Sequence, residues 1–263
     1  MIFYTLSDKG KIRPNNEDYV EAFQLKWSGP TGGVQSLTAL VLADGMGGAA
    51  AGELASQLAV KTVKTKLIQG IFNRPPEELL NTDLKAFLHE SFLEANKAIF
   101  QKGRQEPDME GMGTTIVTML VHKEFITIGH VGDSRGYLYR NGKLKAITRD
   151  HSLVQELIDD GKITQEQAAI HPNRNVITRA LGVDAEVVPD TDRFPILEGD
   201  TFLAASDGLV GFTEESAIKK AFVDFVVEGK SPDLPGLANR LLELAFFGGG
   251  GDNISIALYH HKP

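Results

Sequence analysis

Four apolar segments of this 263-residue sequence each meet an aspartate that has glycine close beside it. The segments are ALVLADGMGG, ITIGHVGDSRG, TFLAASDGLVG and FFGGGGDNISIALY, and their aspartates are Asp44, Asp133, Asp207 and Asp252. An aspartate at the end of a buried strand can face a cleft, and a neighbouring glycine lets a ligand approach the backbone. The repetition predicts a fold in which several strand ends converge on one site.

Carboxylates that converge repel one another, and each costs free energy to remove from water. A cation would neutralise such a cluster, to which the upstream segment RPNNEDYV adds Glu17 and Asp18. The chain has no cysteine and no HExxH pattern, which leaves oxygen atoms as the expected ligands. Oxygen ligands favour Mg²⁺ or Mn²⁺ over Zn²⁺.

The Asp-Gly pairs at Asp44 and Asp207 also have a simpler interpretation. Asp-Gly is among the commonest turn sequences, so one such junction indicates a turn more often than a metal ligand. Four junctions beside long apolar segments favour ligands. The glycine runs GMGGAAAG and GGGGDN are not followed by the Gly-Lys-Ser/Thr of a phosphate-binding loop, so they indicate backbone freedom and not nucleotide binding.

Seven segments have the composition of β-strands, and four have apolar residues at helical spacing. The strands are predicted at 37–43, 114–122, 125–131, 136–140, 143–147, 201–205 and 254–259, and the helices at 50–68, 77–102, 214–227 and 234–247. Short turns between strands, including Asn141-Gly142, favour antiparallel pairing. We therefore predict an α+β fold with a central β-sandwich of two antiparallel sheets flanked by α-helices.

The segment 148–180 is polar and has little apolar periodicity. An insertion of this length in a compact domain is typically a functional loop. The chain has no internal repeat and no long linker, so we expect residues 1–263 to form a single domain.

The charge and composition of the chain limit the kinds of partner that we expect it to bind. The formal net charge of −8, from 27 basic and 35 acidic residues, disfavours binding to nucleic acid or to an anionic membrane. The N-terminus does not have the pattern of a signal peptide, and no apolar stretch is long enough to cross a bilayer. Together with the absence of cysteine, these features lead us to expect a cytoplasmic protein.

Taken together and in order, the motifs closely resemble those of the metal-dependent protein phosphatases of type 2C. The matching stretches are RPNNED, ADGMGG, GTTIV, VGDSR, SDGL and GDNIS, and the resemblance extends from about Thr5 to Tyr259. The segment that begins TRDHSLVQELIDDGKI is similar to the bacterial branch, in which 148–180 corresponds to a flap that affects substrate access. The resemblance implies one catalytic domain, a sandwich flanked by helices, and metals in a cleft at one edge.

The resemblance also implies two Mn²⁺ or Mg²⁺ ions in the core of the site and a third, weaker site of the kind found in bacterial relatives. Asp44 should bridge the two core ions, and the backbone carbonyl of Gly45 should complete the first site. Asp207 and Asp252 should hold the second ion.

Four further residues match positions around these ions. Asp18, together with Glu17, should contact metal-bound water. Asp133 matches the third metal position, and Arg13 matches the arginine that binds phosphate. A guanidinium can bind phosphate oxygens in pairs, which a lysine does less well.

The implied activity is hydrolysis of phosphoserine and phosphothreonine in proteins, by direct attack of a metal-activated water without a phosphoenzyme. We expect a monomer that acts on phosphorylated proteins and opposes a serine/threonine kinase. Two alternatives stay open: an inactive phosphatase-like scaffold, and a hydrolase of small phosphate esters. The presence of Asp44, Asp207 and Asp252 disfavours the scaffold, whereas a small-ester hydrolase would have the same metal centre.

One position departs from the eukaryotic branch of the family, in which a histidine after the Asp-Gly pair is the proposed general acid. Met46 occupies that position here and cannot donate a proton. A metal-bound water is then the first candidate for the acid, followed by His151 and His171. We interpret His130, which lies in an apolar strand, as a core residue.

Overall fold

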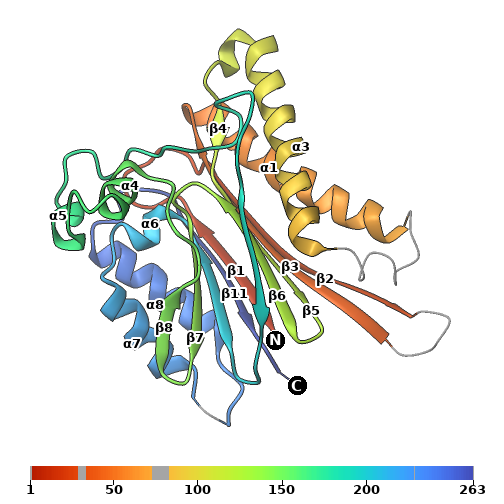
Figure 1. The fold of residues 1–263 in the computed structure, drawn as a ribbon. Helices are drawn as coiled ribbons and strands as arrows, with labels where there is room; N and C mark the ends of the chain where they lie inside the picture. Colours follow the sequence, from red (N-terminus) through yellow and green to blue (C-terminus); the bar gives the residue numbers. More distant parts are fainter. Residues whose placement is uncertain (1, 29–33, 73–82, 228, 263) are drawn as a thin grey trace.

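The computed structural model describes residues 2–28, 34–72, 83–227 and 229–262, and these residues form two antiparallel sheets packed face to face (Figure 1). The first sheet has the strand order β1 (Phe3–Asp8), β11 (Ile254–His260), β10 (Thr201–Ala205), β7 (Arg135–Arg140) and β8 (Lys143–Ala146). The second has the order β2 (Asp18–Ser28), β3 (Val34–Met46), β5 (Ile116–His122), β6 (Phe125–Val131) and β9 (Asp190–Pro195). A short strand, β4 (Gly113–Thr114), pairs with the end of β3.

Helices cover the outer faces of both sheets (Figure 1). The second sheet packs against α1 (Ala49–Phe72) and α3 (Leu84–Gln105), and the first packs against α7 (Glu215–Phe225) and α8 (Leu234–Phe247). The described residues also form three short helices, α4 (Leu153–Asp159), α5 (Gln165–Ala169) and α6 (Asp207–Val210), and a 3₁₀ turn, η1, at Pro107–Met109. The predicted α+β sandwich flanked by helices is confirmed.

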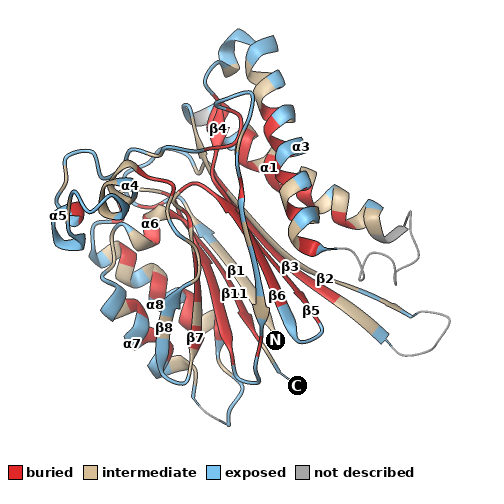
Figure 2. Ribbon diagram, viewed as in Figure 1, coloured by how far each residue is buried: buried red, intermediate tan, exposed pale blue. Residues whose placement is uncertain are grey.

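Successive side chains of β3 point to opposite faces, so this strand contributes to two hydrophobic cores. Leu37, Ala39 and Val41 face α1 and α3, whereas Leu40 and Leu42 face the first sheet. All five side chains are fully buried, as the red colour of β3 in Figure 2 shows. A strand covered on both faces has a continuous apolar sequence, because successive side chains point to opposite faces.

The predicted elements match the structure in type, with most of their ends shifted, and several observed elements were not predicted. The strands 125–131 and 201–205 were predicted with their observed bounds. The structure adds β1, β2 and β9, which the prediction missed, and places α4 and α5 inside the segment 148–180. The predicted helix 77–102 corresponds to α3, which runs Leu84–Gln105, and residues 77–82 lie outside the described residues.

The structure places α6, β4 and the segment 148–180 at the same end of the sandwich (Figure 1). We call the segment 148–180 the flap. Its two ends are joined by a bridge between Ser152 and Ile177. Within the part of the chain that the structure describes, no helix is long and apolar enough to cross a membrane.

Candidate metal centre

Two of the predicted site residues face each other on neighbouring strands. Asp18 is the first residue of β2, and the antiparallel register places it directly opposite Asp44 near the end of β3. Directly opposed residues of such a pair have their Cβ atoms about 4.5–5.5 Å apart. The β2–β3 register therefore brings two carboxylates together at the end of the second sheet.

The first sheet contributes two more carboxylates at the same end. Asp207 begins α6, two residues after the end of β10, and Asp252 lies two residues before β11. The charges of Asp18, Asp207 and Asp252 all act on the carboxyl group of Asp44. Asp133 follows β6, which ends at Val131, and its charge acts on both Asp44 and Asp207. The structure thus brings the four strand-end aspartates and Asp18 into one cluster.

Burial and mutual repulsion raise the pKa of four of these carboxyl groups, those of Asp18, Asp44, Asp133 and Asp207. Burial is the largest cause in every case, and it raises the pKa of Asp18 and Asp207 to about 6 and that of Asp133 to about 7. The pKa of Asp44 lies well above its usual value because of burial and the charges of Asp18 and Asp207. As an all-carboxylate set, the cluster is therefore unfavourable in its charged form at neutral pH.

The donor set fits a hard divalent cation. The Oδ1 atom of Asp18 is buried and has no hydrogen-bond partner among the described residues. Its Oδ2 atom accepts a hydrogen bond of 2.8 Å from Ser206 Oγ. An unpaired buried carboxylate oxygen beside other carboxylates is favourable when a cation balances it, and oxygen donors suit Mg²⁺ or Mn²⁺.

Gly45 occupies a position that only glycine fits. A Cβ atom there would meet the carbonyl oxygens of Gly52 and Glu17. The Gly45 amide donates a hydrogen bond of 3.2 Å to the Glu17 carbonyl, which ties the end of β3 to the loop before β2. The backbone next to Asp44 is therefore held between α1 and the loop that carries Arg13.

Arg13, in the loop between β1 and β2, contacts the cluster through Asp252. Its Nη2 atom lies 2.6 Å from Asp252 Oδ2, and 49% of its side chain is exposed. Its guanidinium is therefore a cation at the solvent side of the site. Glu17 is half-buried, and burial raises its pKa.

Asn253 is a residue whose role sequence reasoning missed. Its buried side chain accepts a hydrogen bond from the Glu17 amide (2.8 Å) and donates to the carbonyls of Lys9 (2.9 Å) and Asn15 (2.8 Å). These three bonds fasten the loop that contains Arg13 to the start of β11. The motif GDNIS contained this residue, but nothing local in the sequence indicates partners near the other end of the chain.

Ser206 is a second such residue. Its hydroxyl donates to Asp18 and accepts from the Ser255 amide at 2.9 Å. Because Asp18 belongs to the second sheet and Ser206 follows a strand of the first, this hydroxyl links the two sheets at the carboxylate cluster.

His151 and His171, the two candidate general acids, lie in different surroundings. His151 is 5% exposed, and its Nδ1 atom accepts a hydrogen bond from the Gly132 amide at 3.2 Å. Burial lowers the pKa of His151 to about 4, which does not suit a group that must deliver a proton near neutrality. His171 lies in the flap, where its Nδ1 atom accepts from the Asn173 amide at 3.1 Å. His130 is buried, as expected of a core residue.

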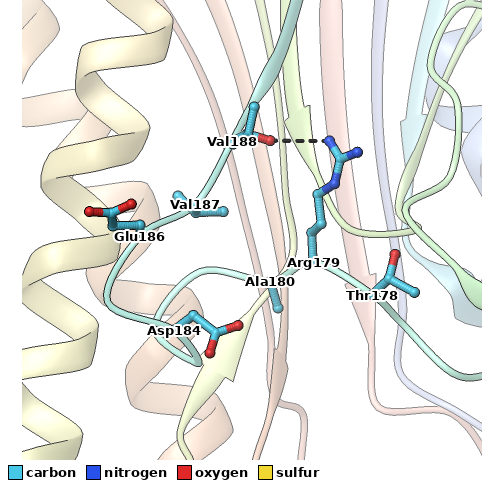
Figure 3. A pocket seen from close by; sticks show the side chains of 7 residues that line it. All are labelled: Thr178, Arg179, Ala180, Asp184, Glu186, Val187 and Val188. Carbon is cyan, nitrogen blue, oxygen red and sulfur yellow. Dashed lines mark hydrogen bonds between the residues drawn. The ribbon is translucent and has the colours of Figure 1, made fainter.

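A pocket of 320 Å³ lies where the flap returns to the second sheet (Figure 3). Its lining consists of Thr178, Arg179, Ala180, Asp184, Glu186, Val187 and Val188. Asn96 of α3 fixes this wall, because its side-chain amide donates to the carbonyls of Asp184 (3.0 Å) and Ala185 (3.2 Å). Thr114 connects the same segment to the cluster, since it pairs with Leu181 and its hydroxyl donates to the Asp44 carbonyl at 2.8 Å.

Comparisons with known proteins agree with this arrangement. Residues 17–241 match the family model described as protein phosphatase 2C. The chain is 36% identical over 252 residues to the serine/threonine phosphatase stp of Listeria welshimeri, covering 96% of this chain and 92% of that protein. It is 38% identical over 252 residues to the serine/threonine protein phosphatase PstP of Mycobacterium tuberculosis, of which it spans 43%.

Solved structures of PstP are similar over nearly the whole chain. The crystal structure of the M. tuberculosis enzyme superposes with a TM-score of 0.82 at 38% identity, covering 99% of this chain and 98% of that one. A structure of the PstP catalytic domain in complex with two manganese ions superposes with a TM-score of 0.79 at 37% identity, with the same coverage. By its family match, its identity to these relatives and its fold, the chain belongs to the protein phosphatase 2C family.

Proposed function

We propose that this chain is a metal-dependent phosphoserine/phosphothreonine protein phosphatase. Its family and its relatives, which are named serine/threonine phosphatases, support this activity. The observation that carries the proposal is the convergence of five aspartates from both sheets on one cluster, with Arg13 at its solvent side.

We assign the residues that would hold the ions as follows. Asp44 lies at the centre of the cluster and would bridge two ions, with the Gly45 carbonyl at the first and Asp207 and Asp252 at the second. Asp133, on the flap side, would hold a third ion. The two manganese ions of the related PstP structure and the all-oxygen donor set favour Mn²⁺ or Mg²⁺.

Divalent cations bound in such a site supply Lewis-acid activation of water and neutralise phosphate charge. The side chains of the protein would position the water and the phosphate group. Asp18, held by Ser206, and the neighbouring Glu17 would accept hydrogen bonds from water around the ions. Arg13 would exchange its ion pair with Asp252 for the phosphate oxygens, to which a guanidinium can donate two parallel hydrogen bonds. Direct attack on phosphorus needs no side-chain nucleophile.

We propose further that the chain forms one catalytic domain and that the flap, 148–180, controls substrate access. The flap lies at the same end of the sandwich as α6 and β4, and it carries the short helices α4 and α5 (Figure 1). We propose a cytoplasmic monomer that opposes a serine/threonine kinase, with neither nucleic acid nor a membrane as partner. Size-exclusion chromatography tests the monomer, and a phosphoproteome comparison with and without the active enzyme identifies the substrates.

The activity is tested by hydrolysis of p-nitrophenyl phosphate with Mn²⁺, with and without a chelator. We expect activity in the wild type with Mn²⁺, none with chelator, and none in Asp44→Ala. Asp224→Ala is the matched control, because Asp224 is an exposed aspartate on α7. Hydrolysis that survives chelation or Asp44→Ala would sink the metal assignment.

The same preparations separate the alternatives. A phosphothreonine peptide should be hydrolysed much faster than a small metabolite phosphate. The reverse preference would favour a hydrolase of small phosphate esters, and binding of phosphopeptide without turnover would favour an inactive scaffold.

A further inference from the structure

His151 holds both polar groups of the Gly132 backbone. The His151 amide donates to the Gly132 carbonyl at 3.0 Å, and the Gly132 amide donates to the ring atom Nδ1 of His151 at 3.2 Å. Both residues are buried. Gly132 immediately precedes Asp133, so the imidazole lies one residue from a carboxylate of the cluster.

The turn at Gly132 is also confined on its other side. Gly132 has a φ of 106°, and a Cβ atom there would lie 2.6 Å from Cβ and Cγ2 of Thr115. The Thr115 hydroxyl lies 2.7 Å from that of Ser134 and accepts from the Asp44 amide at 3.2 Å. The backbone around Asp133 is therefore enclosed between Thr115, which is bonded to Asp44, and His151.

The contacts of the ring indicate its tautomer. Because Nδ1 accepts the Gly132 N–H, the proton of the neutral ring is on Nε2. That atom lies 3.4 Å from Oδ2 of Asp190, and Nη1 of Arg179 lies 3.4 Å from Oδ1 of the same carboxylate. Asp190 thus accepts from Arg179 and lies beside the Nε2 atom of His151, and Figure 3 shows Arg179 pointing toward the neighbouring Val188 carbonyl.

His151, His130 and Asp190 have the composition of a metal site, since one ligand atom of each lies within 4.8 Å of the others. Their hydrogen bonds oppose this interpretation. A metal on His151 Nε2 would displace the proton that faces Asp190, while Nδ1 keeps its bond to Gly132. The guanidinium of Arg179, also 3.4 Å from Nε2, would repel the ion. His130 instead stacks on the His151 ring, with 4.6 Å between centroids, and its Nε2 atom bonds the Arg149 carbonyl at 2.8 Å.

His151 also closes the base of the flap. Its carbonyl accepts a hydrogen bond of 2.8 Å from the Thr178 amide, and Leu153 donates to the Val176 carbonyl at 2.9 Å. The same residue that bonds Gly132 through its amide and ring therefore joins the incoming and returning segments of the flap.

We propose that His151 is a positioning residue. Through Gly132 it sets the direction of the Asp133 carboxylate toward Asp207, and it couples the base of the flap to that carboxylate. It transfers no proton, because both ring nitrogens are engaged in the interior. This inference rests on the proposed function, in which Asp133 is a ligand of the third ion.

Two substitutions of nearly equal size separate the two ring nitrogens. In His151→Asn the amide oxygen can take the place of Nδ1 and accept from Gly132, whereas in His151→Gln the amide takes the place of Nε2 and leaves the Gly132 N–H without a partner. We expect the Mn²⁺ affinity of the weakest site, measured by calorimetric titration, to fall about 10- to 100-fold in His151→Gln, a range typical of residues that orient metal ligands. His151→Asn should bind close to wild type. Equal affinities in the two variants would overturn the proposal, because a space-filling role does not distinguish them.

Further variants distinguish this proposal from the function on which it rests. His171→Gln is the control, since His171 also accepts a backbone N–H through Nδ1 but within the flap. Asp133→Asn should weaken the same site as His151→Gln. If Asp133→Asn binds Mn²⁺ like wild type, the third site and the role of His151 both fail, while Asp44→Asn still reports on the core site. If Asp133→Asn weakens binding and His151→Gln does not, only the role of His151 fails.

A measurement on the wild-type protein needs no variant to fold. Long-range ¹H–¹⁵N spectra distinguish the two neutral tautomers of a histidine ring. We expect the Nε2-protonated form for His151 in the enzyme loaded with diamagnetic Mg²⁺. An Nδ1-protonated or doubly protonated ring would overturn the proposal, because Nδ1 could not then accept from Gly132.

Discussion

Replacing Asn253 with alanine should both destabilise the protein and weaken substrate binding. The substitution removes three hydrogen bonds of 2.8–2.9 Å that a buried side chain makes to the loop carrying Arg13. Each such bond contributes about 0.5–1.5 kcal/mol net, and solvent can reach part of the exposed loop residues Lys9 and Asn15. We expect the free energy of unfolding to fall by about 2–4 kcal/mol.

The loop keeps other attachments, among them the bond from the Lys11 amide to the Gly250 carbonyl, the bond from the Gly45 amide to the Glu17 carbonyl, and the ion pair between Arg13 and Asp252. The folded variant should therefore bind Mn²⁺ but hold Arg13 less firmly, so that KM for a phosphothreonine peptide rises more than kcat falls. Urea unfolding measures the first effect and steady-state kinetics the second. Asn173→Ala, at an exposed flap position, is the matched control and should stay within about 0.5 kcal/mol of wild type.

Two results would refute this reasoning. If Asn253→Ala unfolds at the same urea concentration as wild type, the three bonds do not hold the loop. If stability falls but KM is unchanged, the position of Arg13 does not depend on Asn253.

Three further predictions concern charge. Arg13→Ala should raise KM about 10- to 100-fold, as expected for loss of charge-assisted hydrogen bonds, with Arg13→Lys in between; an unchanged KM would contradict the phosphate role. Burial lowers the pKa of His151 from 6.5 to about 4. The free energy of unfolding that the neutral ring contributes above pH 6.5 is therefore lost as the pH falls toward 4, by at most about 3 kcal/mol. His151→Asn should flatten this part of a urea-unfolding pH profile. Mn²⁺ at 100 times its Kd should stabilise the wild type by about 2.7 kcal/mol but Asp44→Asn much less, and equal thermal shifts would count against Asp44 as a ligand.

The apolar segments next to aspartates allowed both the strands and the candidate ligands to be predicted from the sequence. The apolar segments that form β3, β6, β10 and β11 are buried on both faces, so their composition identifies strands, and the same segments lead directly to the aspartates of the cluster. An apolar strand with an aspartate and a glycine at its end therefore predicted both the element and the candidate ligand.

One of the missed strands, β9, lacks such a local signal. β9, with the sequence DTDRFP, is mostly exposed and lies at the edge of its sheet, so its conformation depends on pairing with β6. By contrast, α4 and α5 had recognisable caps: Ser152 accepts from the Gln155 amide, and Thr164 and Gln167 form a capping box. The caps therefore indicate two short helices, whereas the polar composition of the flap favours loops.

Contacts between distant parts of the chain were beyond sequence reasoning. Asn253 and Lys9 are 244 residues apart, and Ser206 and Asp18 are 188 apart. No periodicity or motif spacing in a single sequence relates such pairs. The cluster itself was predicted through the family motifs, whereas the residues that orient it, Asn253, Ser206 and His151, became visible only in the fold.

The bond between Ser206 and Asp18 has a consequence for protein engineering. Because the carboxylates come from two sheets, the spacing of the cluster depends on how closely those sheets pack, and side chains such as Phe202 and Met119 fill the space between them. Substitutions that expand or contract this interior should retune metal affinity without touching a ligand. A library varied only at these interior positions, screened at limiting Mn²⁺, would therefore be a practical route to enzymes with altered metal requirement.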